Sequence, residues 1–394
     1  MKKILAVMLL LTMMFSLCAC GSESAEQLAA PAEDKASVIG EADDEPVVET
    51  QDEIADAEKL FYEGSFEEAF PLLSAHEDEA IPSVTALLAR AYYFGLGTET
   101  DTDKALELLK KADESGSIAA KYLLADAASN VNGAKLTLDE TDELYKDFVS
   151  AAKSMDPADP DYGVAMTYLA RCYADGKGAA KDSDKALDAA AKAAAAGNLS
   201  PFEQMTLAKV FEDCAPNPED TAAAVAENLN TEVTPPAYVC PEAQELYAKA
   251  ADALKALADA GNARAQKLLG DLCFNGRGGI EQDYAKALAL YEQAADQDYA
   301  DAQAQLGYMY QNGTGVELSY EKAMEWNNRA AQQGNSQGQA QIGYMYHMGL
   351  GVTQNLDEAG RWYTRAAQQG DSWAADMLIL TEVTNPQSVF EAHA

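Results

Sequence analysis

Ser319 and Lys322 are the residues of this 394-residue chain whose types and spacing come nearest to a catalytic pair. In a Ser-x-x-Lys turn of helix, an unprotonated lysine amine can accept the hydroxyl proton, and the serine oxygen can then attack an acyl carbon. Such sites also use a Ser-Asp-Asn and a Lys-Thr-Gly segment, and the sequence contains neither. The pair alone does not indicate catalysis, and we expect the chain not to be an enzyme.

The sequence shows no pattern that would hold a metal ion or a cofactor. His76, His347 and His393 are far apart, and no Cys-x-x-Cys or His-Glu-x-x-His segment occurs. Gly-x-Gly pairs, such as the one at 313–315, follow no strand pattern, so they indicate turns rather than a phosphate-binding loop. We expect no metal and no cofactor.

The net charge excludes one large class of partners. The chain has 28 Lys and Arg against 65 Asp and Glu, which gives a formal charge of −37. Nucleic-acid binding needs clustered cations that contact phosphates, so we expect no nucleic-acid partner. The charge balance favours solubility and cationic partners.

The first residues indicate a different chemistry, the modification of a cysteine thiol. A positive start and an apolar run over 4–17 have the form of a secretory signal and are too short to span a membrane comfortably. The run ends in Leu17-Cys18-Ala19-Cys20-Gly21, which resembles the bacterial lipobox. In that motif a Leu and a small residue precede the cysteine that receives a diacylglyceryl group, and this cysteine corresponds to Cys20. An ordinary cleaved signal is the alternative.

The lipobox resemblance implies an exported, membrane-anchored lipoprotein on the extracytoplasmic side, either at the cell surface or at the periplasmic or outer membrane of a two-membrane host. Residues 1–20 would be the signal peptide that ends at the lipidated cysteine. Residues 21–51 are acidic and lack aromatic side chains, so we expect a disordered tether. Contact with the membrane would come through the N-terminal lipid only.

A spacing pattern that recurs five times predicts the elements of the folded part. Each copy has a Gly-x-Gly pair, or Gly-Arg-Gly-Gly once, with an Ala eight residues after the last Gly and another seven residues later. These alanines are Ala105 and Ala112, Ala186 and Ala193, Ala287 and Ala294, Ala323 and Ala330, and Ala359 and Ala366. Self-similarity at such a period is typical of repeat architectures.

Each copy predicts two helices joined by a tight turn. Ala302, Leu306 and Tyr310 share one face of a first helix, and Trp326 and Trp362 are predicted core residues of second helices. The turn carries a residue type that caps helices. In the five copies it is Asp101, Asp182, Asp283, Ser319 or Asn355. Ser319 is therefore predicted to be a cap and not a nucleophile.

Leu-Gly-x-x-Tyr-x-x-Gly-x-Gly followed by Lys-Ala-x-x-Trp and Ala-Ala-x-x-Gly is similar to the Sel-one-like repeat, a 36-residue relative of the tetratricopeptide repeat. The resemblance implies an all-α fold, a right-handed α-solenoid of helix-turn-helix repeats with a tetratricopeptide-like superhelix. We expect the solenoid over 52–385 and a C-terminal tail over 386–394. Clear repeats are expected at about 84–116, 164–197, 263–298, 300–334 and 337–370.

The first half of the array is expected to be less regular. A weaker opening is expected at 56–76, with half-repeats at 119–128, 204–211 and 373–380. Insertions are expected at about 130–160, with one extra helix around 139–154, and at about 214–241 as a Pro-rich loop.

Four cysteines belong to the expected solenoid. Cys172 and Cys273 fall on core positions. Cys214 and Cys240 flank the Pro-rich loop and could form a disulfide, which an exported location permits, and two free thiols are the alternative.

Variable positions on the first helices indicate where a partner could bind. In tetratricopeptide arrays the first helix of each pair lines the concave surface, and exposed Tyr, Phe and Arg are common binding anchors. The candidate positions just after the small Gly or Ala, or three residues further on, are Arg90, Tyr93, Arg171, Asp271, Phe274, Tyr308, Gln311, Tyr344 and His347. We therefore expect a protein or peptide partner, of unknown identity, in a concave groove.

Together these features favour a lipid-anchored adaptor or scaffold at the cell envelope. One alternative is a cell-wall glycan-binding lipoprotein in which Tyr308, Tyr344 and Trp373 stack on sugar rings. A second alternative is an envelope hydrolase or β-lactam-binding protein, for which the sequence lacks a clustered nucleophile and base.

Overall fold

The computed structural model describes residues 46–130, 138–215 and 240–384. The chain divides at Pro46 into two units, and the helices belong to the second. The described residues form 17 α-helices and no strand, so the expected all-α fold is confirmed. The predicted signal peptide, most of the predicted tether and the predicted C-terminal tail lie outside the described residues.

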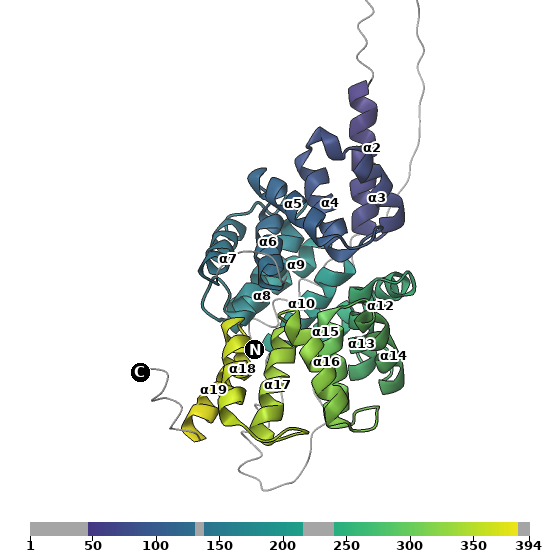
Figure 1. Cartoon of the computed structure of the whole chain (residues 1–394). Coiled ribbons are helices and arrows are strands. Elements are labelled where there is room, and N and C mark those ends of the chain that lie inside the picture. Colours follow the sequence, from purple (N-terminus) through teal and green to yellow (C-terminus); the bar gives the residue numbers. More distant parts are fainter. Residues whose placement is uncertain (1–45, 131–137, 216–239, 385–394) are drawn as a thin grey trace, which may run out of the picture. The chain divides into compact units, whose positions relative to one another are not determined.

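The helices follow one another as pairs, each with a first and a second helix, and a single last helix ends the series (Figure 1). Their bounds are α2 Pro46–Glu63 and α3 Phe66–Ala75; α4 Pro82–Phe94 and α5 Thr102–Glu114; α6 Ile118–Asn130 and α7 Leu138–Ala152; α8 Tyr162–Asp175 and α9 Ser183–Ala196; α10 Pro201–Cys214 and α12 Pro241–Asp259; α13 Ala263–Asn275 and α14 Tyr284–Ala295; α15 Ala300–Asn312 and α16 Tyr320–Gln332; α17 Ser336–Met348 and α18 Leu356–Gln368; and α19 Ser372–Thr384. A 3-10 helix, η2, covers Glu77–Glu79.

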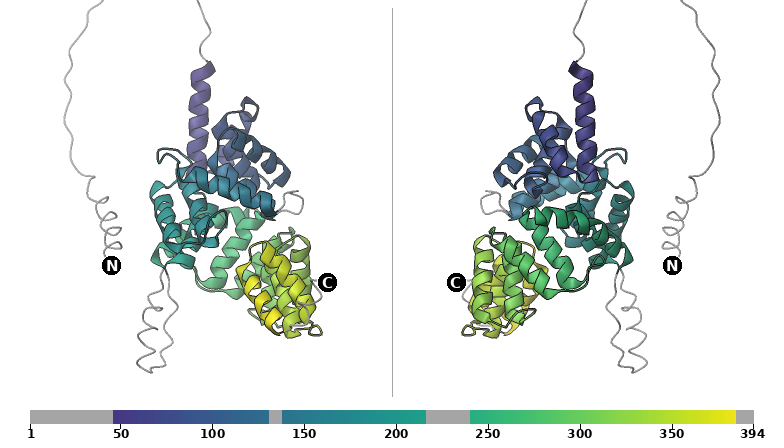
Figure 2. Two further views of the ribbon diagram at one scale, coloured as in Figure 1. Left: turned by 90° about the vertical axis from the view of Figure 1, so that its left-hand side faces the viewer. Right: turned by 90° about the vertical axis from the view of Figure 1, so that its right-hand side faces the viewer.

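From α4 onward, the two helices of a pair pack against each other and each pair packs against the next along the chain (Figure 2). This nearest-neighbour packing is what an α-solenoid predicts. None of the described helices combines the length and the apolar character needed to cross a membrane.

The turns between paired helices are built as the spacing predicts. Side-chain oxygens of the five cap residues accept backbone N–H groups of the following helix; these residues are Asp101, Asp182, Asp283, Ser319 and Asn355. Gly313 ends α15 at a φ of +66°, a left-handed conformation that glycine adopts without strain. Ser319 accepts the N–H of Lys322 at 3.3 Å, so its hydroxyl serves as a helix cap.

Two stretches differ from the expected interruptions. α6 and α7, at 118–130 and 138–152, form a full helix pair, in which α7 is the extra helix expected around 139–154. In the second stretch, α12 pairs with α10. Both pairs lack the Gly-x-Gly marker, so the repeat pattern did not reveal them as pairs. The Pro-rich loop itself, at 216–239, lies outside the described residues.

The first helix begins earlier than expected. α2 starts at Pro46, whereas the sequence places the folded part from about residue 52. A proline is compatible with the first turn of a helix, because its missing N–H would have no partner there. The short acidic and apolar segment 46–51 thus extends α2 and does not belong to a tether.

A tyrosine of the second helix packs against a glycine of the first. A Cβ added to Gly270 would lie 2.6 Å from Cε1 of Tyr291, and one added to Gly343 would lie 2.8 Å from the ring of Tyr363. These glycines therefore leave the space that each ring fills. In the copy between them Asn327 takes the tyrosine position, and its Oδ1 has no hydrogen-bond partner among the described residues.

The prediction that Trp326 and Trp362 are core residues is wrong. Both are only partly buried, and the residue after each one, Asn327 or Tyr363, is fully buried instead. The guanidinium carbon of Arg329 lies 4.6 Å from the centre of the Trp326 ring, and Arg365 lies at the same distance from Trp362. Each indole is thus half-buried with a cation on its ring, and Trp326 also packs against the core.

The cysteines of the described residues are free thiols, so the disulfide between Cys214 and Cys240 is not formed. Cys240 precedes α12, and its thiol lies 3.3 Å from a carboxylate oxygen of Glu242. Burial raises the pKa of both thiols. Cys172 and Cys273 are fully buried, which confirms their prediction as core residues.

Candidate binding groove

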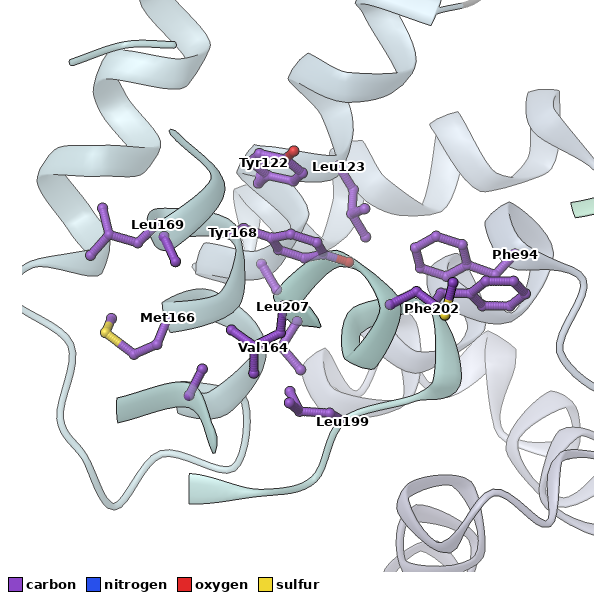
Figure 3. Packing of buried hydrophobic residues seen from close by; sticks show 14 of the residues in the cluster. Phe94, Tyr122, Leu123, Val164, Met166, Tyr168, Leu169, Leu199, Phe202 and Leu207 are labelled. Carbon is purple, nitrogen blue, oxygen red and sulfur yellow. The ribbon is translucent and has the colours of Figure 1, made fainter. Parts of the chain in front are cut away.

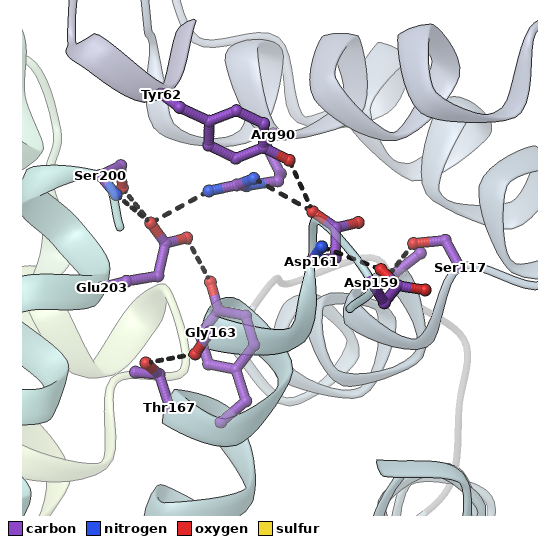
Figure 4. A network of polar contacts seen from close by, with 11 residues as sticks. Tyr62, Arg90, Ser117, Asp159, Asp161, Gly163, Thr167, Ser200 and Glu203 are labelled. Atoms are coloured by element: carbon purple, nitrogen blue, oxygen red, sulfur yellow. Dashed lines mark hydrogen bonds and ion pairs between the residues drawn. The ribbon is translucent and has the colours of Figure 1, made fainter. Parts of the chain in front are cut away.

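Arg90 of α4 lies in the interior and not in a groove. Its side chain is 1% exposed. Its Nη2 donates to a carboxylate oxygen of Glu203 at 3.1 Å, and its Nη1 lies 3.8 Å from Asp161 (Figure 4). Its guanidinium also lies 5.3 Å from the centre of the Phe61 ring. The expectation that Arg90 lines a surface open to a partner is therefore wrong.

Glu203, the buried partner of Arg90, is surrounded by hydrogen-bond donors. It accepts the hydroxyl of Tyr168 at 2.8 Å and the backbone N–H of Ser200 at 2.9 Å. Burial acts to raise the pKa of Glu203, but Arg90 and the donors Ser200 and Tyr168 outweigh burial and lower it below its ordinary value. The carboxylate is thus charged, and it connects α4, α8 and α10.

Aromatic rings close the space beside this network. Phe94 of α4 and Phe202 of α10 stack with their centres 5.0 Å apart (Figure 3). Tyr122 of α6 and Tyr168 of α8 stack at 4.2 Å. Asn262, which caps α13, donates from Nδ2 to the carbonyl of Phe94 at 2.8 Å. The rings of Phe94, Phe202, Tyr122 and Tyr168 therefore fill the space between α4, α6, α8 and α10.

An open cavity of about 630 Å³ lies further along, on the first helices α8, α10, α13 and α15. Four of the nine predicted partner-binding residues line it: Arg171, Asp271, Phe274 and Tyr308. A second cavity of about 1140 Å³ adjoins it and shares the lining residues Arg264, Lys267, Tyr299, Asp301 and Gln337. These shared residues belong to the lining of the first cavity, and we call that cavity the inner groove.

Sequence reasoning missed the residues one and two turns earlier on the same helices. Phe202, Arg264, Asp301 and Gln337 occupy one equivalent position on α10, α13, α15 and α17, and all four line the inner groove. Arg264, Asp301 and Gln337 stand seven residues before the predicted residues Asp271, Tyr308 and Tyr344. Residues seven apart share a helical face, and this spacing could have identified them.

The remaining predicted residues lie elsewhere. Tyr93 lines the second cavity, and its hydroxyl donates to Asp126 at 2.7 Å. Gln311 is only 7% exposed, so the expectation that it faces a partner is wrong. Tyr344 packs against Trp373 with ring centres 5.8 Å apart, and the His347 ring lies 6.2 Å from that of Tyr363. Gln311, Tyr344 and His347 line neither cavity.

Most cations of the inner groove are held by carboxylates. Arg171 donates to Asp175 at 2.9 Å and to Asp213 at 3.1 Å. Lys267 lies 2.7 Å from Asp271. In the same cavity Lys209 lies 2.8 Å from Asp213, and Arg277 lies 2.8 Å from Glu212.

Arg264 differs from the other cations of the groove. Among the described residues, no carboxylate forms an ion pair with it within 4.0 Å. Its guanidinium carbon lies over three aromatic rings, 4.8 Å from the centre of Phe94 and 5.6 Å from the centres of both Phe202 and Tyr93. Burial acts to lower its pKa, but nearby Tyr299 and other acidic groups raise it, so Arg264 remains charged.

The groove is suited to binding and not to proton transfer. Burial raises the pKa of Tyr247, Tyr291 and Tyr299, so these hydroxyls stay protonated and act as hydrogen-bond groups. Tyr291 donates to Asp271 at 2.9 Å. The part of the chain that the structure describes contains no cluster of three His, Cys, Asp or Glu that could hold a metal ion.

Comparison with known proteins places the repeats in a family. The model of the Sel1 repeat matches residues 83–117, 163–198, 236–253, 263–299, 300–335 and 336–371. Five of these matches correspond to the five repeats expected from the sequence, and the match at 236–253 includes the start of α12. Proteins of this family typically mediate protein–protein interaction, and they are generally not enzymes.

An uncharacterised protein of Neisseria meningitidis serogroup B is 27% identical over 281 residues, which are 64% of this chain and 51% of that protein. The chain thus spans about half the length of this curated relative.

Solved structures of similar proteins include a protective antigen of uropathogenic Escherichia coli strains that displays an SLR fold. It has 24% identity over 79% of this chain and 67% of its own, with a TM-score of 0.34. A Sel1 repeat protein from Oxalobacter formigenes has 37% identity over 32% of this chain and 93% of its own, with a TM-score of 0.29. On the strength of the repeat matches, this chain belongs to the Sel1 repeat family.

Proposed function

We propose that the chain binds a segment of a protein partner in the inner groove and acts as an adaptor or scaffold. One observation carries this proposal: side chains that differ from copy to copy gather from α8, α10, α13 and α15 around one open cavity. Packing of each helix pair on the next does not by itself require an open cavity between these helices. Around Arg90, by contrast, the chain's own side chains fill the space.

Tyr308 is suited to test this proposal, because it lines the groove and is 40% exposed. A photo-crosslinking amino acid in place of Tyr308 of the full chain should give one dominant adduct with a protein of the host. The matched control carries the same amino acid in place of Leu318, which is 49% exposed but lines neither cavity. Adducts at both positions, or at neither, would contradict binding in the groove.

The glycan-binding alternative is not favoured by the positions of its aromatic residues. Tyr308 lines the inner groove, whereas Tyr344 and Trp373 pack against each other outside both cavities. The hydrolase alternative would need the Ser319 hydroxyl as a nucleophile, and that hydroxyl caps α16. We therefore propose only the binding of a protein segment.

We further propose that the chain is a lipoprotein held at the extracytoplasmic face of a membrane through Cys20, as an envelope adaptor. The support is the sequence Leu17-Cys18-Ala19-Cys20-Gly21 and the apolar run before it, all of which lie outside the described residues. Lipid on the N-terminal cysteine would hold the chain at the membrane surface without a membrane-spanning segment.

Replacing Cys20 by Ala should release the protein from the membrane fraction, because the thiol that receives the lipid is gone. The measurement is phase partitioning in detergent, together with the intact mass of the mature protein. Cys18→Ala is the matched control and should stay in the membrane fraction with its lipid mass unchanged. The proposal would be wrong if Cys20→Ala remained lipidated, or if Cys18→Ala were the variant that lost the lipid.

A further inference from the structure

The inner groove departs from the charge of the whole chain. The chain carries 28 Lys and Arg against 65 Asp and Glu. Among the residues that line the open cavity, cations outnumber carboxylates, although Asp175 and Asp213, outside this lining, pair with Arg171 and Lys209. Its cations are Arg171, Lys209, Arg264, Lys267 and Arg277, and its carboxylates are Glu212, Asp271 and Asp301. The net charge of the chain favours cationic partners in general, but this surface is complementary to an anionic segment.

Arg264 is the cation of the groove that can bind a further carboxylate. The other four are each within 4 Å of a carboxylate of the chain. Within the described ranges Arg264 has no carboxylate at that distance, and the rings of Phe94 and Phe202 lie against its guanidinium. Tyr93 already lies within hydrogen-bonding reach of Arg264. The stacked guanidinium has further in-plane N–H donors, and a carboxylate matches their geometry.

The carboxylates nearest to Arg264 are already engaged by other donors. Asp301 accepts the hydroxyl of Tyr299 at 3.2 Å and Nδ2 of Asn335 at 2.7 Å. Asp126 accepts the hydroxyl of Tyr93 at 2.7 Å. These bonds orient both carboxylates, and the charges of both raise the pKa of Arg264.

Apolar side chains adjoin Arg264 in the groove. Phe202 and Met205 come from α10, and Leu268 comes from α13, one turn after Arg264. A segment whose carboxylate binds Arg264 would therefore place a neighbouring side chain on an apolar surface. Water would be partly excluded there, which strengthens a charge-assisted hydrogen bond.

We propose that the partner segment is an acidic peptide, in which the side chain of an Asp or Glu binds Arg264 and an adjacent apolar side chain contacts Leu268, which is half-buried in the groove. This inference rests on the proposed function, because it names the chemistry of the segment that the groove would take. Arg264 and the carboxylate form the specific contact, and the apolar neighbours set the kind of residue beside it.

The test begins with a random library of 12-residue peptides displayed on phage and selected on the full chain. The most enriched peptide is synthesised, labelled with a fluorophore, and measured by fluorescence anisotropy. We expect it to contain Asp or Glu next to an apolar residue. Replacing that acid by its amide should weaken binding at least 10-fold, whereas amidating the C-terminus should have no effect.

Variants of the chain locate the contact. Arg264→Gln should weaken binding of the acidic peptide at least 10-fold and should not weaken binding of the amide peptide further, because both changes remove one contact. Arg264→Lys should retain part of the affinity. Arg361→Gln is the matched control, since Arg361 is an exposed arginine of α18 that pairs with Glu358 at 2.6 Å, and it should bind as the wild type does.

The outcomes separate this inference from the proposed function. Tyr308→Ala could weaken peptide binding while neither Arg264→Gln nor the change of the peptide acid to its amide affects it. In that case the groove binds peptides and the acidic contact is wrong. If only C-terminal amidation abolishes binding, the carboxylate is terminal and the side-chain inference is wrong. If no peptide is enriched, or none responds to Tyr308→Ala or Arg264→Gln, both proposals fail. The peptide replacement needs no protein variant, so it tests the contact even if Arg264→Gln does not fold.

Discussion

Replacing Arg90 by Met is expected to lower the free energy of unfolding by about 3–5 kcal/mol, because it leaves the charge of Glu203 buried without its partner. Glu203 is 0% exposed and lies on α10, while Arg90 lies on α4. The measurement is equilibrium unfolding in urea followed by far-ultraviolet circular dichroism. Hydrogen exchange should show that the loss of protection centres on α4, α8 and α10.

Lys111→Met is the matched control for a lost cation. Lys111 pairs with Glu107 at 2.7 Å on the surface of α5, and both side chains are 57% exposed. Removing an exposed pair of this kind costs about 0–1 kcal/mol. If Arg90→Met lost no more stability than Lys111→Met, the network around Glu203 would not hold these helices together.

A double variant separates the charge from the packing. Nε and Nη1 of Arg90 have no hydrogen-bond partner among the described residues, so the buried pair is not fully satisfied. Arg90→Met together with Glu203→Gln removes both charges, and we expect it to be more stable than Arg90→Met alone. A double variant less stable than Arg90→Met would show that packing, and not the buried charge, accounts for the loss.

The pH dependence has a defined direction. The pKa of Glu203 is lowered from its ordinary value of 4.5, although burial alone would raise it. A lowered pKa in the folded state stabilises the fold at pH values above 4.5, and this stabilisation is lost as the pH falls through the folded-state pKa. The difference in stability between wild type and the Arg90→Met, Glu203→Gln variant should therefore shrink in acid.

Local features of the fold could be predicted from the sequence, because they depend on residues close together in the chain. The cap at Ser319 and the helix end at Gly313 follow from residue types within one turn. The network of Arg90 could not be predicted in this way. Its partner Glu203 is 113 residues away, and nothing in one repeat shows which other repeat its first helix will meet.

Some of the residues that line the inner groove could be predicted from the sequence, because they occupy one position of the repeat. Comparison of copies identified Asp271 and Tyr308 as variable positions on a shared face, and they line the cavity. It also selected Gln311, at the position equivalent to Phe274, and the structure buries Gln311. Arg264 was missed because the comparison began after the small residue of the first helix. Sequence variation thus indicates a face of the helix, but burial on that face depends on the neighbouring pairs.

Tyr363 and Trp362 show how adjacent residues of one helix can have different effects on stability. Tyr363→Ala is expected to lower the free energy of unfolding by about 3–5 kcal/mol, because it removes a fully buried ring that fills the space beside Gly343. Trp362→Ala removes a partly exposed ring and its contact with Arg365, so its cost should be about 1–2 kcal/mol. Urea unfolding of both variants measures the difference.

Tyr363→Phe is the control that separates the ring from its hydroxyl. The hydroxyl of Tyr363 is buried and has no hydrogen-bond partner among the described residues, so removing it should leave stability unchanged or slightly higher. A large loss in Tyr363→Phe would mean that the hydroxyl has a partner in solution. If Trp362→Ala cost as much as Tyr363→Ala, the half-buried indole would contribute as much packing to α18 as the buried tyrosine ring, contrary to this prediction.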